Sequence, residues 1–148
     1  MGDLPAPRVQ PSRPFTVTRL DYAGPYLFKL QGGRGVRSSK CYVAIFVCFS
    51  TKAVHFELVS DLSTPRFIAA LKRFIAHHGK PVKIMSDCAS NFKKANKSSE
   101  LAHFTTGEDI TWIFNPPAAP HFGGIWEFAV KSKKFHLRRV IGSTLLTY

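Results

Sequence analysis

The chain has 148 residues, 45% of them hydrophobic, which is enough for one substantial core and too few for two independent ones. Its 21 lysines and arginines against nine acidic residues give a net charge of +12, which favours a polyanionic partner, above all nucleic acid. No apolar run is long enough to cross a membrane, and three cysteines without a CxxC pair predict neither a disulfide framework nor a zinc site. We therefore expect one basic domain from a reducing compartment, without a membrane partner.

Residues 1–13 are rich in proline and arginine and predict an extended N-terminal segment, so the globular domain is expected over residues 14–148. The first strand is predicted from Phe15 to Tyr22, where β-branched and aromatic residues gather. Ala23-Gly24-Pro25 should end it, which places Asp21 near the end of a strand. Lys29–Lys40 mixes glycine with cations and predicts a loop, either a solvated hairpin tip or a contact with phosphate.

An apolar run at Cys41–Phe49 predicts a strand that is covered on both faces of its sheet. A three-residue turn should lead it back into a second strand at Ala53–Val59. In this second strand His55 and Glu57 alternate with three apolar residues, so we expect these two polar side chains on the less buried face.

The clearest helix is predicted to begin with Thr64 as its N-cap and to stop at Gly79. Near its end stand His77 and His78. Adjacent helical residues point about 100° apart, so we assign these two histidines no metal-ligand role.

Three shorter elements follow in the order strand, helix, strand. Val82–Ser86 predicts a strand that delivers Asp87 at its carboxyl end. Ser98 should cap a short helix through Phe104, and Ile110–Phe114 predicts the next strand.

The last element is predicted as a helix that begins near Ile125, after a loop with three prolines and Gly123-Gly124. Its apolar face should comprise Trp126, Ala129, Val130, Lys133, Leu137 and Val140. The opposite face should carry one acid and three cations: Glu127, Lys131, Lys134 and Arg138. This face is either a solvated surface with a Glu127–Lys131 ion pair or a functional one.

Three of the nine acids stand beside both an apolar element and a break in regular structure, namely Asp21, Asp87 and Glu127. Three carboxylates brought together repel one another unless hard divalent cations neutralise them. We therefore expect these residues to hold two Mg²⁺ or Mn²⁺ ions, which suit phosphodiester chemistry. The surrounding cations would then hold DNA.

Several ordered motifs carry a resemblance: DYAGP, TKAVHFELVSDLST, RFIAALKRFIAHHGKP, SDxxxNF, WIFNPPAAPHFGGIWE and VKSKKFHLRRVIG. Over residues 14–148 the sequence resembles the integrase catalytic core of Pao/BEL-type LTR retrotransposons, which is similar to retroviral integrase. The resemblance implies an α/β, ribonuclease-H-like fold, with a mixed central sheet of about five strands flanked by helices.

The resemblance also implies DNA integration, by 3′-end processing and strand transfer, with Asp21, Asp87 and Glu127 as a D,D,E triad that binds the metal ions. It implies that DNA, as element ends and target, is contacted by Lys131, Lys134, Arg138, Asn91 and His121. It further implies a homo-oligomer in the full-length protein and nuclear action.

One motif departs from the family, which usually reads SDNGTNF where this chain has Cys88 and Ala89 after Asp87. The family's zinc-binding and C-terminal DNA-binding domains have no counterpart, so we expect a fragment of a longer polyprotein. The main hypothesis is an active polynucleotidyl transferase core. The alternative is a catalytically inactive, transposon-derived domain that binds nucleic acid, and a third reading is a basic structural domain with a chance triad.

Overall fold

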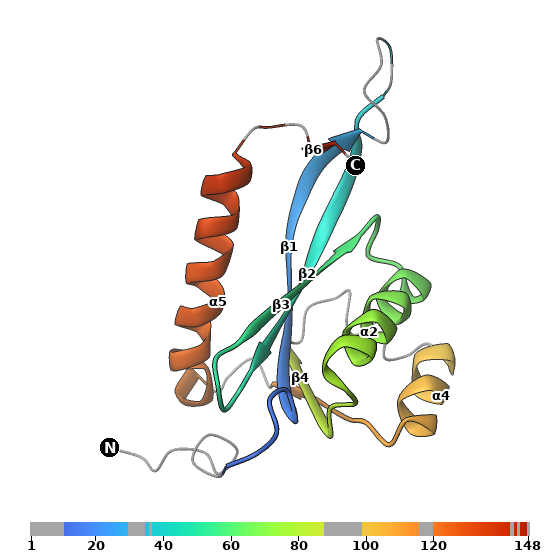
Figure 1. Ribbon diagram of the computed structural model, residues 1–148, viewed down its shortest axis with the longest axis vertical. Helices are drawn as coiled ribbons and strands as arrows, with labels where there is room; N and C mark the ends of the chain where they lie inside the picture. The colour runs from blue at the N-terminus through green and yellow to red at the C-terminus, as the bar shows by residue number, and fades with distance from the viewer. Residues whose placement is uncertain are drawn as a thin grey trace.

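The computed structural model describes residues 11–29, 35, 37–87, 99–115, 120–142, 144 and 146–147. These form strands and helices in the order β1 Val17–Lys29, β2 Ser39–Cys48, β3 Val54–Val59, α2 Thr64–His78, β4 Lys83–Asp87, α4 Ser99–Gly107, β5 Thr111–Asn115, α5 Pro120–Ile141 and β6 Leu146–Thr147. Figure 1 shows the sheet in the middle, with α5 on one side and α2 and α4 on the other.

The sheet is mixed, with strand order β3-β2-β1-β4-β5 and the two-residue β6 paired to β1. Strands β1, β2 and β3 form antiparallel pairs, whereas β4 and β5 extend the sheet in parallel from β1. The predicted α/β architecture with a mixed central sheet flanked by helices is therefore confirmed.

Strand β2 is covered on both faces, as its uninterrupted apolar run predicts. Phe46 belongs to the core cluster that includes Phe74 of α2 and Leu101 of α4. Ile45, the neighbouring residue, belongs to the cluster on the other face, where Val130 of α5 packs. Burial on both sides removes apolar side chains from water around the sheet, and this is the main term that stabilises the fold.

Strand β1 does not end at Ala23-Gly24-Pro25, and this prediction was wrong. The strand runs on to Lys29, with a shift of register against β2 between Ala23 and Tyr26. Gly24 has φ +125°, and a Cβ there would lie 3.1 Å from the carbonyl oxygen of Cys41. Glycine therefore permits a bulge in a continuing strand, which places Asp21 inside β1 rather than near its end.

The prediction that His55 and Glu57 occupy the less buried face of β3 was also wrong. Glu57 is 8% exposed, whereas Phe56 and Leu58 are 43% and 37% exposed. The buried face is the one that α2 covers, and α2 supplies polar partners there. Hydrogen bonding to these partners offsets the cost of burying the carboxylate.

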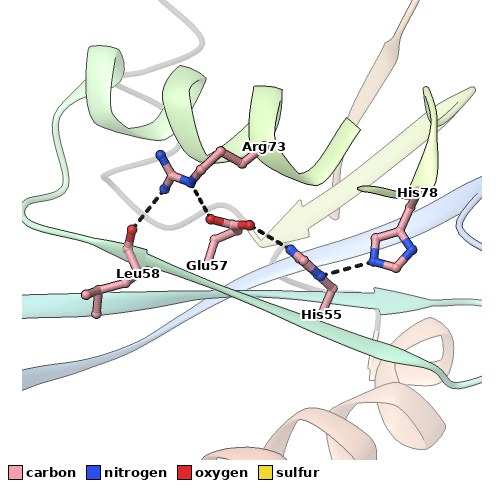
Figure 2. Close-up of polar contacts among 5 residues, drawn as sticks. All are labelled: His55, Glu57, Leu58, Arg73 and His78. Carbon is pink, nitrogen blue, oxygen red and sulfur yellow. Dashed lines mark hydrogen bonds and ion pairs between the residues drawn. The ribbon is translucent and has the colours of Figure 1, made fainter. Parts of the chain in front are cut away.

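Figure 2 shows these partners as one chain of polar contacts between β3 and α2. Arg73 donates from Nε to Glu57 Oε2 at 2.5 Å and from Nη2 to the Leu58 carbonyl at 3.0 Å. His55 Nε2 lies 2.8 Å from Glu57 Oε1, and His78 Nε2 lies 3.0 Å from His55 Nδ1. Burial opposes ionisation of Glu57, but the hydrogen bonds from Arg73 and His55 hold its pKa below the usual value.

The boundaries of α2 agree with the prediction except at its first residue. Ser63, not Thr64, is the N-cap, and the helix ends at Gly79, whose φ is 79° and whose N–H donates to the Ile75 carbonyl at 2.8 Å. The guanidinium of Arg13 packs against Gly79, where a Cβ would collide with it. The segment just before β1 is thereby attached to the end of α2.

Helix α5 begins at Pro120, five residues before the predicted start, and its backbone is helical through Gly123-Gly124. Proline is favoured at the first helical position, where its missing N–H would have no intrahelical acceptor. Other differences are smaller: β2 begins at Ser39, α4 continues to Gly107, and β6 was not predicted.

Candidate active site

Asp21 projects from β1 toward α5, and both of its carboxylate oxygens have partners. The backbone N–H of Tyr22 donates to Oδ1 at 2.7 Å. Lys134 Nζ of α5 lies 2.8 Å from Oδ2. The side chains of Lys134 and Asp21 are 37% and 19% exposed, so the ion pair is partly withdrawn from water.

Asp87 is the last residue of β4, as predicted. The parallel register pairs Leu20 of β1 with Ser86 of β4, and the next residue on each strand is an aspartate. The backbones of Asp21 and Asp87 therefore stand at the same level on neighbouring strands. The side chain of Asp87 lies outside the described part of the structure.

The third predicted acid, Glu127, stands on α5, and its side chain also lies outside the described part. It precedes Lys134 by seven residues, which is two helical turns and about 10.5 Å along the axis. Residues spaced by seven share a helix face, so the position of Glu127 lies on the line of the helix that reaches β1 at Asp21.

The predicted buried face of α5 was wrong in part, because the helix is rotated about its axis relative to the prediction. Val130 is buried and Leu137 packs against the same cluster, as expected, but Val140 is 84% exposed. Lys134 was expected on the face opposite the apolar one and instead turns inward to Asp21. Because Asp21 gives this lysine a partly buried counter-charge, the face of α5 that packs on the sheet contains one cation among its apolar side chains.

The predicted DNA contacts fall into three groups. Lys131 and Arg138 are exposed on α5, where phosphate could reach them. Lys134 is paired with Asp21. The sequence could have suggested this pairing, because Glu127 was expected beside Asp21 and a residue seven positions later lies on the same helix face. His121 lies in α5 with its side chain outside the described part, and Asn91 lies wholly outside it.

The described residues contain no group of three or more histidine, cysteine, aspartate or glutamate side chains that could hold a metal ion. The predicted ligand set includes two side chains beyond that description, so this finding does not bear on the triad. No helix within the described ranges is long and apolar enough to cross a membrane.

A hollow in the described structure lies elsewhere. It has a volume of about 410 Å³ and is lined by residues at one end of the sheet and on α2: Phe28, Cys41, Leu58, Val59, Ser60, Arg66, Ala69 and Arg73. Arg73 is already bound to Glu57 and Arg66 lies 3.9 Å from Asp61, so its two cations have acidic partners. Asp21 does not line this cavity.

Comparison with known proteins places the fold. No protein-family model matches the sequence, and no curated protein matches it. Among solved structures, a chain of the simian T-cell lymphotropic virus intasome in complex with the PP2A regulatory subunit B56γ is 19% identical, with a TM-score of 0.64 over 97% of this chain. This chain covers 48% of that one, about half its length.

Two further structures are of the HTLV-2 integrase catalytic core domain in complex with magnesium, in a dimeric and a trimeric form. Each is 20% identical with a TM-score of 0.58 over 86% of this chain, which covers 73% and 72% of their chains. At this level of identity the likeness is one of fold. The chain has the α/β, ribonuclease-H-like fold of retroviral integrase catalytic cores.

Proposed function

We propose that this chain is the catalytic core of an integrase of the Pao/BEL type, acting on DNA by divalent-metal-dependent phosphoryl transfer. The reactions would be 3′-end processing and strand transfer. The observation that carries the proposal is the matched position of Asp21 and Asp87 on parallel strands, beside a helix that brings a cation to Asp21. The likeness to integrase cores supports the same reaction class.

The residues present suit a hard divalent cation. Carboxylate oxygens are the ligands that Mg²⁺ and Mn²⁺ prefer, and Asp21 Oδ2 already accepts a positive charge at 2.8 Å from Lys134. Asp21, Asp87 and Glu127 would hold two ions, which supply activation of a water or hydroxyl and stabilisation of the leaving oxygen when bound. The HTLV-2 core in complex with magnesium supports this choice of metal.

The chain's own residues would do the rest of the work. Burial and the N–H of Tyr22 fix the Asp21 carboxylate in place, which reduces the cost of organising the site at the moment of reaction. Lys131 and Arg138, both exposed on α5, would hold backbone phosphates beside it. The dimeric and trimeric HTLV-2 forms and the intasome support a homo-oligomer that acts on DNA. We further propose that the DNA comprises element ends and target, and that the protein acts in the nucleus.

The second candidate is an inactive, transposon-derived domain that binds nucleic acid without cleaving it. It is favoured by Cys88 and Ala89, which follow Asp87 directly where the family usually has asparagine and glycine. Alanine adopts a left-handed backbone at a cost of about 1 kcal/mol or more, so this change bears on the course of the chain beside Asp87.

A disintegration assay on branched DNA with millimolar Mn²⁺ separates the two candidates. An enzyme should release and rejoin the strands, and Asp21→Asn should abolish both while the protein stays folded. Glu100→Gln is the matched control, because it removes one exposed acid from α4, away from the site. If the parent binds DNA but yields no product, the inactive domain is the correct reading, and Cys88→Asn with Ala89→Gly tests the cause.

A further inference from the structure

The outward side of α5 carries two large exposed aromatic side chains among cations. Phe128 is 75% exposed and Phe135 is 59% exposed. Lys131, Arg138 and Arg139 are exposed on the same stretch. We call these five residues the outer stripe of α5. An exposed phenyl ring does not gain the favourable free energy of burial, and neighbouring exposed apolar groups are typical of a binding surface.

The geometry of the helix places the two cations Lys131 and Arg138 between the side of α5 that faces Asp21 and the two outward rings. Val130, Leu137 and Ile141 pack toward the sheet. At about 100° per residue, Lys131 and Arg138 stand roughly 90° around the helix from that inward line, and Phe128 and Phe135 stand about 150° from it. The order around α5 is therefore Lys134 on Asp21, then the two cations, then the two rings. In Figure 1 α5 forms one margin of the molecule.

The charge of the helix indicates what the partner is. Residues 128–142 contain five lysines and arginines and no acid, and three of these cations, Lys131, Arg138 and Arg139, belong to the outer stripe. Arg139 itself lies over the Phe135 ring, 5.9 Å from its centroid. A second copy of α5 laid against the first would bring these like charges together, which opposes self-association through this face. A polyanion satisfies the same charges.

We propose that the outer stripe binds single-stranded DNA, with bases stacked on Phe128 and Phe135 and phosphates held by Lys131, Arg138 and Arg139. A ring can stack on a base only where the base face is free, so duplex DNA would use the cations alone. The two rings are seven residues and about 10.5 Å apart along α5, which is about three steps of a stacked strand. This inference rests on the proposed function in taking DNA as the polyanion.

The test measures binding of the full chain to a labelled single-stranded 20-mer of mixed sequence and to its duplex, by fluorescence anisotropy in EDTA. Phe135→Leu keeps an apolar side chain but removes the flat ring, and Phe135→Tyr keeps the ring. Phe56→Leu on β3, where the ring is 43% exposed, is the matched control. Thermal melts confirm that each exposed substitution leaves the protein folded.

We expect Phe135→Leu to weaken single-strand binding about 5- to 150-fold, the range for loss of one base–aromatic stack. Duplex binding should change less than about twofold, and Phe135→Tyr and Phe56→Leu should bind single strands like the parent. The salt dependence should be unchanged in Phe135→Leu, because a ring neutralises no phosphate, whereas Arg139→Gln should reduce its slope by about 0.7.

Two results would overturn the proposal. The first is parent-like single-strand binding by Phe135→Leu, or an equal loss for single strand and duplex. The second is a parent that sediments as a dimer and becomes monomeric in Phe135→Leu with DNA binding unaltered, which would assign the face to a second copy. EDTA removes the metal ions that catalysis needs, so the binding test does not depend on catalytic activity. A negative disintegration assay would refute the proposed enzyme activity, whereas a negative binding test would refute only the binding of single strands by the outer stripe.

Discussion

Replacing Lys134 by methionine removes the ammonium that faces Asp21 while keeping the aliphatic part of the side chain. Two unit charges 2.8 Å apart attract by about 1.5 kcal/mol at the dielectric constant of water. Lys134 is 37% exposed, so screening and the entropy of ordering a lysine reduce the net contribution to about 1 kcal/mol. In a chain of this size that corresponds to a fall in Tm of about 2–4 °C, measured by thermal unfolding in EDTA.

Added divalent metal should raise the Tm of the parent and of Lys134→Met by different amounts. If Asp21 is a metal ligand, bound Mg²⁺ or Mn²⁺ neutralises it in both proteins, so the metal-dependent rise in Tm should be larger for Lys134→Met than for the parent. The competing ammonium is absent from the variant. In an Asp21→Asn background Lys134→Met should have almost no effect, because the partner charge is gone.

Lys133→Met is the control, since it removes an exposed lysine from the adjacent position on α5. Two observations would refute the reasoning about the ion pair: a parent-like Tm for Lys134→Met in EDTA, or an equal loss in Lys133→Met. A metal response that is identical in the parent and in Lys134→Met would separate Asp21 from the metal site.

The remaining predictions concern the second acid, the DNA surface and pH. Asp87→Asn should slightly raise the Tm of the metal-free protein by relieving repulsion among the acids, and should abolish stabilisation by Mn²⁺; a parent-like metal response would remove Asp87 from the site. Alanine at both Lys131 and Arg138, which are exposed on α5, should weaken binding of all DNA sequences and flatten the log–log salt dependence, and an unchanged slope would place both cations off the DNA surface. Urea unfolding should show stability falling as pH drops below about 6.5, because burial and the charges of neighbouring histidines lower the pKa of His78, so the unfolded chain binds the proton more readily. A second fall is expected below about pH 4.5, where the lowered pKa of Glu57 acts in the same direction; it should be smaller in Glu57→Gln, in which only other carboxyl groups such as Asp61, whose pKa is also lowered, contribute.

The order of strands and helices could be predicted because it depends on local patterns. The apolar run of β2 requires cover on both faces, and Gly79 stops α2 with a positive φ that residues with a side chain rarely adopt. The position of Asp87 at the end of β4 could likewise be predicted from the apolar residues directly before it. Each of these outcomes is fixed by residues within a few positions of one another.

The orientation of β3 could not be predicted from alternation alone. The alternating pattern favours burying Phe56 and Leu58, but Arg73 lies 16 residues beyond Glu57 and His78 lies 23 beyond His55. Only the packing of α2 over the strand shows that the buried carboxylate has partners there. A polar side chain's burial depends on its partners as much as on its own chemistry.

The bulge in β1 escaped prediction for a related reason. Ala23-Gly24-Pro25 has the composition of a turn, and composition alone gives no information about a neighbouring strand. The antiparallel partner β2 continues past this point and pairs again from Tyr26 to Phe28, so the chain remains in the sheet. Continued pairing, a non-local term, overrides the local turn signal.

The candidate site and the outer stripe of α5 both depend on the rotation of that helix about its axis. The apolar pattern alone centres the buried face near Lys133, whereas the structure is turned by roughly 60° from it, less than the angle of about 100° between successive residues. This turn exposes Val140 and brings Lys134 to Asp21, so it exchanges apolar burial for a partly buried ion pair. A further turn that buried Phe128 and Phe135 would carry Lys134 away from Asp21 and expose Val130. The contact at Asp21 and the exposure of the two rings are therefore consequences of one helix orientation, and the ion pair at Asp21 contributes to holding the rings toward the solvent.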